Sequence, residues 1–393
     1  MNYLLVHPFK ILGFPLLVVT LCSFETSSAF AEESSAEMDT TGVATLNESR
    51  DGSGTSWMPD ATPMYGFHQM LGDWRLMYHA NLFLQSIHES SPRADDQIGS
   101  INWVMVMADT SVGSGNSSLR LMMSAENWTV GKCGYLDLLQ TGEVSNGKAL
   151  HDQQHPHDLF MEMAATYKLP LSHDLGLEIY GGLVGEPALG PTAFPHRLSA
   201  FPGPKGPVSH HWLDSTHISF GVATVGLYTT QWRSEVSAFN GREPDDNRTD
   251  FDLGTMDSYS GRISYLPTAE WALQISGGRL TDAEKSDNGR YFDVERYTAS
   301  AIYHHRLEDG GIWASTAAYG ANVEHGSQAP ASLLETSLNR DEKHVYSARF
   351  ETVKKSGHDL AFMNPVHESR SRRTDFYAHK THDWLPLSIL SFA

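Results

Sequence analysis

The sequence contains only two cysteines among its 393 residues, Cys22 and Cys133. Cys22 lies in an N-terminal segment that we expect to be removed, so the mature chain would keep one thiol and form no internal disulfide. Basic residues are also scarce, because 28 Lys and Arg stand against 47 Asp and Glu and the formal net charge is −19. This deficit argues against a nucleic-acid-binding protein, which needs a basic face.

Long apolar runs are missing beyond the N-terminal stretch Ile11–Leu21. A helix that crosses a bilayer needs about 20 apolar residues, so the sequence excludes a polytopic helical membrane protein. Lys10 before the apolar stretch and Ala29-Phe30-Ala31 after it are typical of a secretory signal peptide and its cleavage site. We therefore predict that residues 1–31 are a signal peptide.

The next segment, residues 32–73, begins with a stretch rich in Ser, Glu, Thr and Gly and poor in large apolar side chains. Such a composition buries too little apolar surface to offset the entropy cost of ordering the chain. We predict a flexible periplasmic segment here.

From Trp74 onward the sequence alternates between apolar and polar residues with a period of two. In residues 74–84 the even positions are apolar, whereas Arg75, His79 and Asn81 occupy odd positions. Successive side chains of a strand point to opposite faces, so one face of such a strand is apolar and the other is polar. The same pattern predicts strands at 74–84, 101–108, 118–126, 159–169, 175–184, 217–228, 231–240, 258–266, 270–279, 293–304, 311–320, 332–339 and 344–353.

These strands indicate a membrane barrel rather than a soluble sandwich. The clearest of them run for about nine to eleven residues, which matches the bilayer, whereas a sandwich needs only about five or six. The connections alternate between long and short, as in outer-membrane barrels with long external loops and short periplasmic turns. We predict an all-β, antiparallel transmembrane β-barrel of about 14 strands (roughly 12–16) over residues 74–363.

Six longer stretches carry distinctive motifs. They are T-S-W-M-P-D-A-T-P-M-Y-G-F-H-Q-M-L-G-D-W-R-L-M-Y-H-A-N from Thr55, H-D-Q-Q-H-P-H-D-L-F-M-E from His151, G-E-P-A-L-G-P from Gly185, H-H-W-L-D-S-T-H-I-S-F-G from His210, F-N-G-R-E-P-D from Phe239 and S-Y-S-G-R from Ser258. With these motifs, residues 55–355 resemble a proteobacterial family of outer-membrane β-barrel proteins. The resemblance implies a barrel, often encoded near heavy-metal (copper) resistance loci, and it assigns no activity.

The end of the chain departs from that family pattern beyond about Met363. The family continues with further strands, whereas Arg370–Ala393 looks basic and irregular. Leu390-Ser391-Phe392-Ala393 is also unlike the aromatic-terminated strand with which such barrels usually end. We predict an irregular tail over residues 364–393, and we leave open whether the barrel closes.

Histidine clusters on two of the long connections provide candidate metal ligands, because imidazole suits copper, zinc or nickel. Both connections fall at the same end of the predicted barrel. The second is stiffened by six prolines and should bend over or into the lumen. The candidate ligands, for copper or zinc, are His151, His155, His157, Asp158, His196, His210 and His211. The alternative is that these side chains pair with neighbouring loops or cap a crowded rim.

Methionine is a weaker indication of metal binding, although its thioether is a soft donor for Cu(I). We place five methionines on apolar, lipid-facing sides of strands and interpret them as packing residues: Met105, Met107, Met123, Met161 and Met163.

The polar strand faces predict a lumen of mixed charge. The lumen-facing candidates are Arg75, Arg120, Glu162, Glu178, Arg233, Glu235, Arg262 and Arg296. Because both signs occur, ion-pair ladders that fill a closed lumen are as consistent with the pattern as a selectivity ring is.

Enzyme motifs such as G-x-S-x-G, G-x-x-x-x-G-K-[ST], H-E-x-x-H and C-x-x-C are absent from the sequence. We predict an outer-membrane channel or solute-specific porin with His-rich external loops linked to copper handling. Its partners would be outer-membrane lipid and small solutes or metal ions. Two alternatives stay open: a non-conducting envelope protein that sequesters metal through its loops, and a membrane hydrolase whose Ser, His and acid come from separate strands.

Overall fold

The computed structural model describes residues 42–43, 46, 48–89, 95–131, 133–145, 148–285, 291–324, 326–341, 344–356, 360 and 384–392. The chain divides into two units, Met1–Asp39 and Thr40–Ala393. The first unit, which includes the predicted signal peptide, lies outside the described residues.

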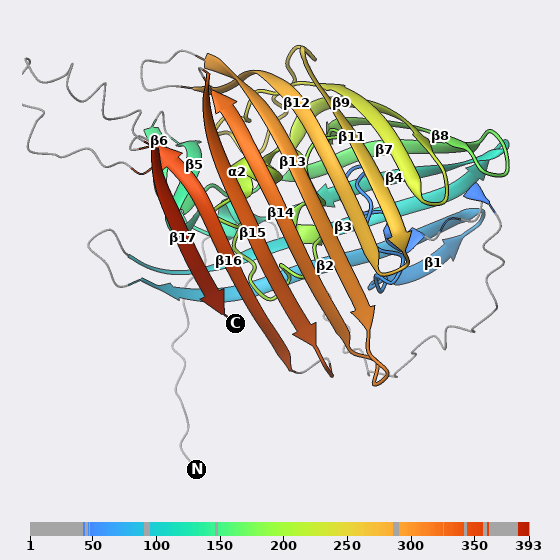
Figure 1. The fold of residues 1–393 in the computed structure, drawn as a ribbon, viewed down its shortest axis with the longest axis horizontal. Coiled ribbons are helices and arrows are strands. Elements are labelled where there is room, and N and C mark those ends of the chain that lie inside the picture. The colour runs from blue at the N-terminus through green and yellow to red at the C-terminus, as the bar shows by residue number, and fades with distance from the viewer. Residues whose placement is uncertain are drawn as a thin grey trace, which may run out of the picture. The chain divides into compact units, whose positions relative to one another are not determined.

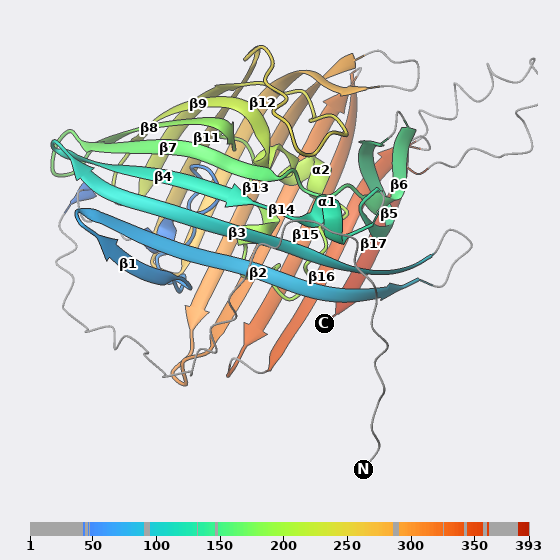
Figure 2. The same cartoon turned by 180° about the vertical axis from the view of Figure 1, so that it is seen from behind.

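The second unit is dominated by one antiparallel sheet of 15 strands in the order β1-β2-β3-β4-β7-β8-β9-β10-β11-β12-β13-β14-β15-β16-β17. Each strand pairs with the next strand of the sheet along the chain (Figure 1, with the reverse view in Figure 2). The strands are β1 (Phe67–Leu71), β2 (Trp74–His88), β3 (Asp96–Val112), β4 (Gly115–Met123), β7 (Phe160–Pro170), β8 (Gly176–Gly185), β9 (Ser219–Tyr228), β10 (Trp232–Phe239), β11 (Ser258–Thr268), β12 (Trp271–Lys285), β13 (Tyr291–Arg306), β14 (Ile312–Glu324), β15 (Ser327–Asn339), β16 (Val345–Ser356) and β17 (Trp384–Phe392).

The predicted fold class, an antiparallel all-β barrel sheet, is confirmed, and each of the thirteen predicted strands is present. A separate hairpin, β5 (Tyr135–Ser145) and β6 (Lys148–Gln154), interrupts the series between β4 and β7. Within the described residues, β1 and β17 stand at the two ends of the strand order and no pairing joins them.

The helices are short and lie in the connections. They are η2 (Glu48–Arg50), α1 (Glu126–Thr129), η3 (Phe194–His196), α2 (His210–Leu213) and η4 (Ser215–His217). Among the described residues, no helix has the length and apolarity needed to cross a bilayer.

The long connections emerge at one end of the sheet because all neighbouring strands are antiparallel. Residues 124–159, 186–218 and 240–257 lie at that end, whereas residues 171–175 and 229–231 form short turns at the other. Beyond β12 the difference in length between the connections at the two ends disappears, because the strands continue past their predicted ends. The predicted alternation therefore holds for the first part of the barrel only.

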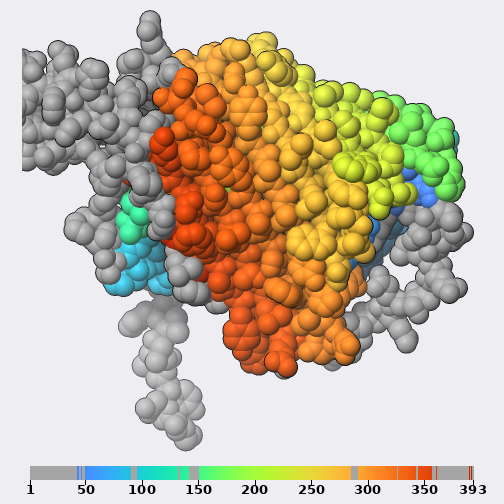
Figure 3. Space-filling model, in the orientation of Figure 1, coloured from blue at the N-terminus to red at the C-terminus, as the bar shows by residue number. Residues whose placement is uncertain are grey.

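The strands bury their polar side and expose their apolar side. On β10 the neighbours Glu235 and Val236 are 2% and 58% exposed, respectively. Strands β9 and β11 alternate in the same way. This arrangement is the reverse of a soluble sheet and is the pattern of a sheet with a lipid-facing surface and a polar interior. Figure 3 shows side chains packed over the outward face of the C-terminal strands.

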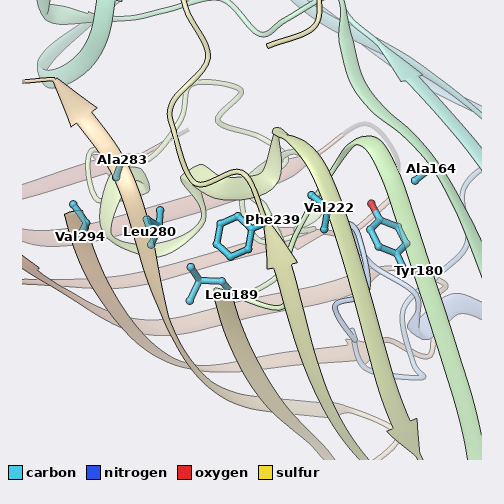
Figure 4. Close-up of a cluster of buried hydrophobic side chains, with 8 residues drawn as sticks. All are labelled: Ala164, Tyr180, Leu189, Val222, Phe239, Leu280, Ala283 and Val294. Carbon is cyan, nitrogen blue, oxygen red and sulfur yellow. The ribbon is translucent and has the colours of Figure 1, made fainter. Parts of the chain in front are cut away.

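Two segments fill the space enclosed by the sheet. We call residues 48–62 the inner segment and residues 186–218 the infolded loop. Trp57 of the inner segment packs with Tyr228 and Ile302 of the wall. Leu189 of the infolded loop lies in an apolar cluster with Phe239 and Leu280 (Figure 4).

The inner segment corrects the prediction that residues 32–73 are flexible. Met58 N–H donates to the Arg50 carbonyl, and Asp51 pairs with Trp57 in an isolated bridge. Residues Phe67–Leu71 also form strand β1. The low apolar content of the segment predicted flexibility wrongly. The segment is ordered by polar contacts with the barrel wall, and these cannot be seen in its composition.

The C-terminal segment 364–393, which we predicted to be an irregular tail, contains a strand. Residues Trp384–Phe392 form β17, which pairs antiparallel with β16 from Ser356↔Trp384 to Ala348↔Phe392. The pairing uses the open backbone edge of β16, and no pattern within residues 364–393 indicates that edge. Residues 361–383 lie outside the described ranges.

We expect Trp57→Ala to release the inner segment from the wall, because Trp57 is 5% exposed and Arg50 and Arg233 lie over its ring at 4.8 and 5.6 Å. Loss of such a buried ring costs about 3–5 kcal/mol. Limited proteolysis of the refolded protein should then cut within residues 48–62. The control Trp128→Ala, at a side chain 62% exposed, should keep the segment protected. Equal protection in both variants would contradict the packing role of Trp57.

Candidate functional site

A ladder of buried ion pairs crosses the inward face of β8, β10 and β11. Arg233 Nη2 lies 2.5 Å from Glu178 Oε1 and 3.1 Å from Glu235 Oε2. Arg262 Nε donates to Glu235 Oε1 at 2.8 Å. Burial of a charge is costly unless it is paired and hydrogen-bonded, so each of these groups requires the others.

Arg262 also holds both segments that fill the interior. Its Nη1 donates to the Gly190 carbonyl at 3.0 Å, in the infolded loop. Its Nη2 donates to Thr55 Oγ1 at 3.0 Å, in the inner segment. A single guanidinium therefore connects the wall to two parts of the chain that are distant in sequence.

A second set of charges secures the other side of the inner segment. Lys168 Nζ lies 2.5 Å from Asp51 Oδ2, and Arg120 Nη1 donates to the Gly54 carbonyl at 2.7 Å. Burial opposes ionisation of Asp51, but Lys168 and Arg120 outweigh it and hold the Asp51 pKa below its ordinary value. Asp51 is thus held as a carboxylate beside two cations of the wall.

The infolded loop is tied to the C-terminal strands in the same manner. Arg197 lies between Asp214 Oδ2, 2.5 Å from its Nη1, and Glu335 Oε1, 2.8 Å from its Nε. Ser209 donates through N–H and Oγ to Glu351 Oε2 at 2.9 and 2.7 Å. Although burial opposes ionisation of Asp214, Arg197 and then His210 hold its pKa well below the ordinary value. The loop is therefore attached to the wall by buried ion pairs and hydrogen bonds.

The first histidine group lies on β6 and the connection that follows it. His151 is on β6, and burial lowers the pKa of His155 well below its ordinary value. Burial would also lower the pKa of His157, but the Glu126 carboxylate, 2.9 Å from its Nδ1, raises it instead. Burial raises the pKa of Asp158 to about 6, although Arg248 lies 3.4 Å away.

The second histidine group lies in the infolded loop. His210 Nδ1 is 2.7 Å from Asp214 Oδ1, and burial nevertheless lowers the His210 pKa to about 4. His211 Nδ1 lies 3.7 Å from Glu243 Oε1. The His196 ring packs on Trp103 with centroids 5.5 Å apart.

The structure brings the two histidine groups together through His217, which was not among the predicted ligands. The centroid of its ring lies 5.4 Å from that of His157 and 5.1 Å from that of His210. Phe194 packs against all three rings. The proline-rich connection thus bends into the interior and meets the connection that carries His157.

The predicted ligands nevertheless do not converge on one point. In the described part of the chain, the one group of three His, Cys, Asp or Glu side chains with ligand atoms within 4.8 Å of one another is Asp245, Asp250 and Asp252. These aspartates lie in connection 240–257, where an exposed acidic cluster is common without an ion. A metal bound by the seven predicted residues stays a prediction.

The predicted lumen residues lie on the inward face, and all but Arg75 are buried there. Arg75 is partly exposed and lies 3.5 Å from Asp109 near a short turn. The other seven are buried: Arg120, Glu162, Glu178, Arg233, Glu235, Arg262 and Arg296.

Three methionines assigned to the lipid face lie in the interior instead. Met105 and Met161 are buried, and Met107 packs against the same cluster. The prediction was wrong because part of the inward face of the wall is apolar. An apolar side of a strand can therefore face the interior as well as lipid. Met123 and Met163 are half-buried on the opposite sides of their strands.

Sequence reasoning missed several interior residues, above all Asp51, Thr55, Glu186, Arg197 and Asp214. A signal for most of them existed. The motifs from Thr55, Gly185 and His210, which strand periodicity leaves unexplained, coincide with the inner segment and the infolded loop.

No protein-family model matches this chain, and no curated protein matches it. Solved structures similar to it include OccAB4 of Acinetobacter baumannii, at 10% identity over 71% of this chain and 67% of that chain, with a TM-score of 0.34. An anion-selective porin from Comamonas acidovorans is 8% identical over 70% and 89% of the two chains, with a TM-score of 0.31. Salmonella typhi OmpF, in complex with daunomycin, is 9% identical over 83% and 100%, with a TM-score of 0.35. The fold described above rests on the strand pairing of this chain itself.

The carboxyl group of Glu186 makes the interior sensitive to pH. Burial raises its pKa to about 8, although Arg262 Nη1 lies 3.7 Å away. A folded-state pKa above that of the unfolded chain means that stability falls as the pH rises toward 8, because the folded protein must then ionise a buried acid.

Glu186→Gln mimics the neutral acid. We expect its free energy of unfolding to equal that of the wild type at pH 5 and to exceed it by roughly 2–4 kcal/mol at pH 9. Urea unfolding in detergent, followed by tryptophan fluorescence, measures the difference. The exposed control Glu308→Gln should show little change with pH. A Glu186→Gln effect of equal size at both pH values would refute a titrating carboxyl.

Proposed function

We propose that this chain is an outer-membrane β-barrel channel for small solutes or ions, and that the inner segment and the infolded loop close its lumen. The observation that carries the proposal is the set of contacts made by Arg262. One wall residue donates hydrogen bonds to both interior segments, at Thr55 and Gly190.

The outward surface supports a lipid environment. Leu84 and Ile98 are 84% and 85% exposed in the isolated chain, an arrangement that water penalises and hydrocarbon favours. Aromatic rings follow one another near the short turns, with centroids of Trp271 and Tyr303 4.7 Å apart and those of Tyr303 and Trp313 5.6 Å apart. Such a girdle is typical of the membrane–water boundary of a barrel.

The number of strands supports a channel. A barrel of about eight strands is filled by its own side chains, whereas a wider one encloses space that a channel or a plug occupies. Here 15 strands surround folded peptide, and that peptide is attached through charged groups of the wall. A purely structural barrel has no need of a separately folded interior.

Conductance in planar bilayers tests the proposal. The wild type should conduct rarely and in small steps. Arg120→Gln/Arg262→Gln removes the hydrogen bonds that these two arginines donate to the inner segment, and it should conduct in larger and more frequent steps. The control Arg242→Gln/Arg279→Gln removes two exposed ion pairs, with Asp282 and Asp293, and should behave as the wild type.

Deletion of residues 48–62 provides a second route to the same result if the double variant does not fold. Heat-dependent gel mobility reports folding of each protein. Silent bilayers with folded variants of both kinds would overturn the channel and favour the non-conducting envelope protein.

A further inference from the structure

A small cavity lies inside the barrel where the wall, the inner segment and the infolded loop meet. Its volume is about 10 Å³, which is room for about one water-sized particle. Apart from the Ser53 hydroxyl, the side chains with donor atoms around it are Met122, Met161, His196, His217, Glu162 and Glu186. Two thioethers, two imidazoles and two carboxyl groups therefore surround a space that suits a single ion.

The two sulfur donors come from adjacent wall strands, and one of them is placed by a β-bulge. Met122 pairs with Glu162, but Met123 pairs with Phe160, so Met161 is left as the extra residue of β7. A bulge changes the direction of a side chain at the point where it occurs. As a result Met161 and Glu162 are both buried, and Met122 and Met161 are each 2% exposed.

The His217 imidazole presents an unused acceptor. Its Nδ1 lies 2.9 Å from the Asp214 carbonyl oxygen, and because a carbonyl only accepts, Nδ1 carries the proton. The lone pair of the neutral ring is then on Nε2, which is buried and has no hydrogen-bond partner within the described residues. An Nδ1–H held by a carbonyl is the arrangement that orients metal-binding histidines.

Two carboxyl groups line the cavity, each with an arginine nearby. The carboxyl groups of Glu162 and Glu186 line it, and the nearest guanidinium nitrogens are those of Arg120 at 3.8 Å and Arg262 at 3.7 Å. Both distances are longer than charge-assisted hydrogen bonds, so neither carboxyl group is tightly engaged by its arginine.

We propose that this cavity binds one soft monovalent metal ion, Cu(I), through the Met122 and Met161 thioethers and the His196 and His217 imidazoles. Thioether sulfur selects Cu(I), whereas Zn(II) prefers thiolate, imidazole and carboxylate. The site shares only His196 with the ligands predicted from sequence. It requires the folded interior but not conductance, so it and the proposed function fail independently.

Binding of Cu(I) to the refolded full chain tests the site. The ion is kept reduced under anaerobic conditions and competed against a chromogenic Cu(I) chelator, with Ag(I) as a redox-inert second probe. We expect one ion per chain. Met122→Leu/Met161→Leu preserves volume and should weaken binding roughly 100-fold. Met123→Leu/Met163→Leu, on the opposite sides of the same two strands, is the matched control and should bind as the wild type.

X-ray absorption of the copper complex provides a second measurement, in which sulfur neighbours should be present in the wild type and lost in Met122→Leu/Met161→Leu. Equal affinity of the two double variants, or Zn(II) displacing Cu(I) at equal concentration, would overturn the assignment. So would the absence of Cu(I) binding to protein whose gel mobility shows it to be folded. Binding without conductance would instead leave the site standing and remove the channel.

Discussion

Burial of charge within the sheet is the constraint on which the rest of the structure depends. The apolar sides of the strands face outward, so their polar and charged groups are confined to the interior. A guanidinium such as that of Arg262 then needs an acceptor for each N–H group. Glu235 accepts one of its five N–H groups, and Gly190 and Thr55 accept two more. The interior segments are thus the hydrogen-bond partners that the wall requires.

The strands could be predicted because alternation is a local property of the sequence. Residues Trp232–Phe239 alone show which side of β10 is polar, and the structure has the same side buried. The inner segment could not be predicted in this way. Its contact between Thr55 and Arg262 joins residues 207 positions apart. Composition within residues 32–73 carries no information on such a partner, and the same holds for β17 on the open edge of β16.

The candidate sites could also be predicted only in part, because the sequence places the histidines but does not show which residues contact them. Connection lengths were enough to place His157 and His210 at one end, and their rings both contact His217. Which nitrogen of each ring is available is decided by partners such as Glu126 and Asp214, which lie elsewhere in the sequence. The bulge at Met161 is also invisible in the sequence, because it is a property of the register between β4 and β7.

The proposed closure of the lumen and the proposed metal site both depend on the infolded loop. The infolded loop supplies His196, His217 and Glu186, whereas the wall supplies Met122 and Met161. An ion bound at the proposed site would add a bond between loop and wall, and its binding free energy would favour the proposed closed arrangement. The coupling is reciprocal, so any solute that displaces the infolded loop also weakens the hold on the ion. If both proposals hold, passage through the lumen depends on bound metal without a separate sensing domain.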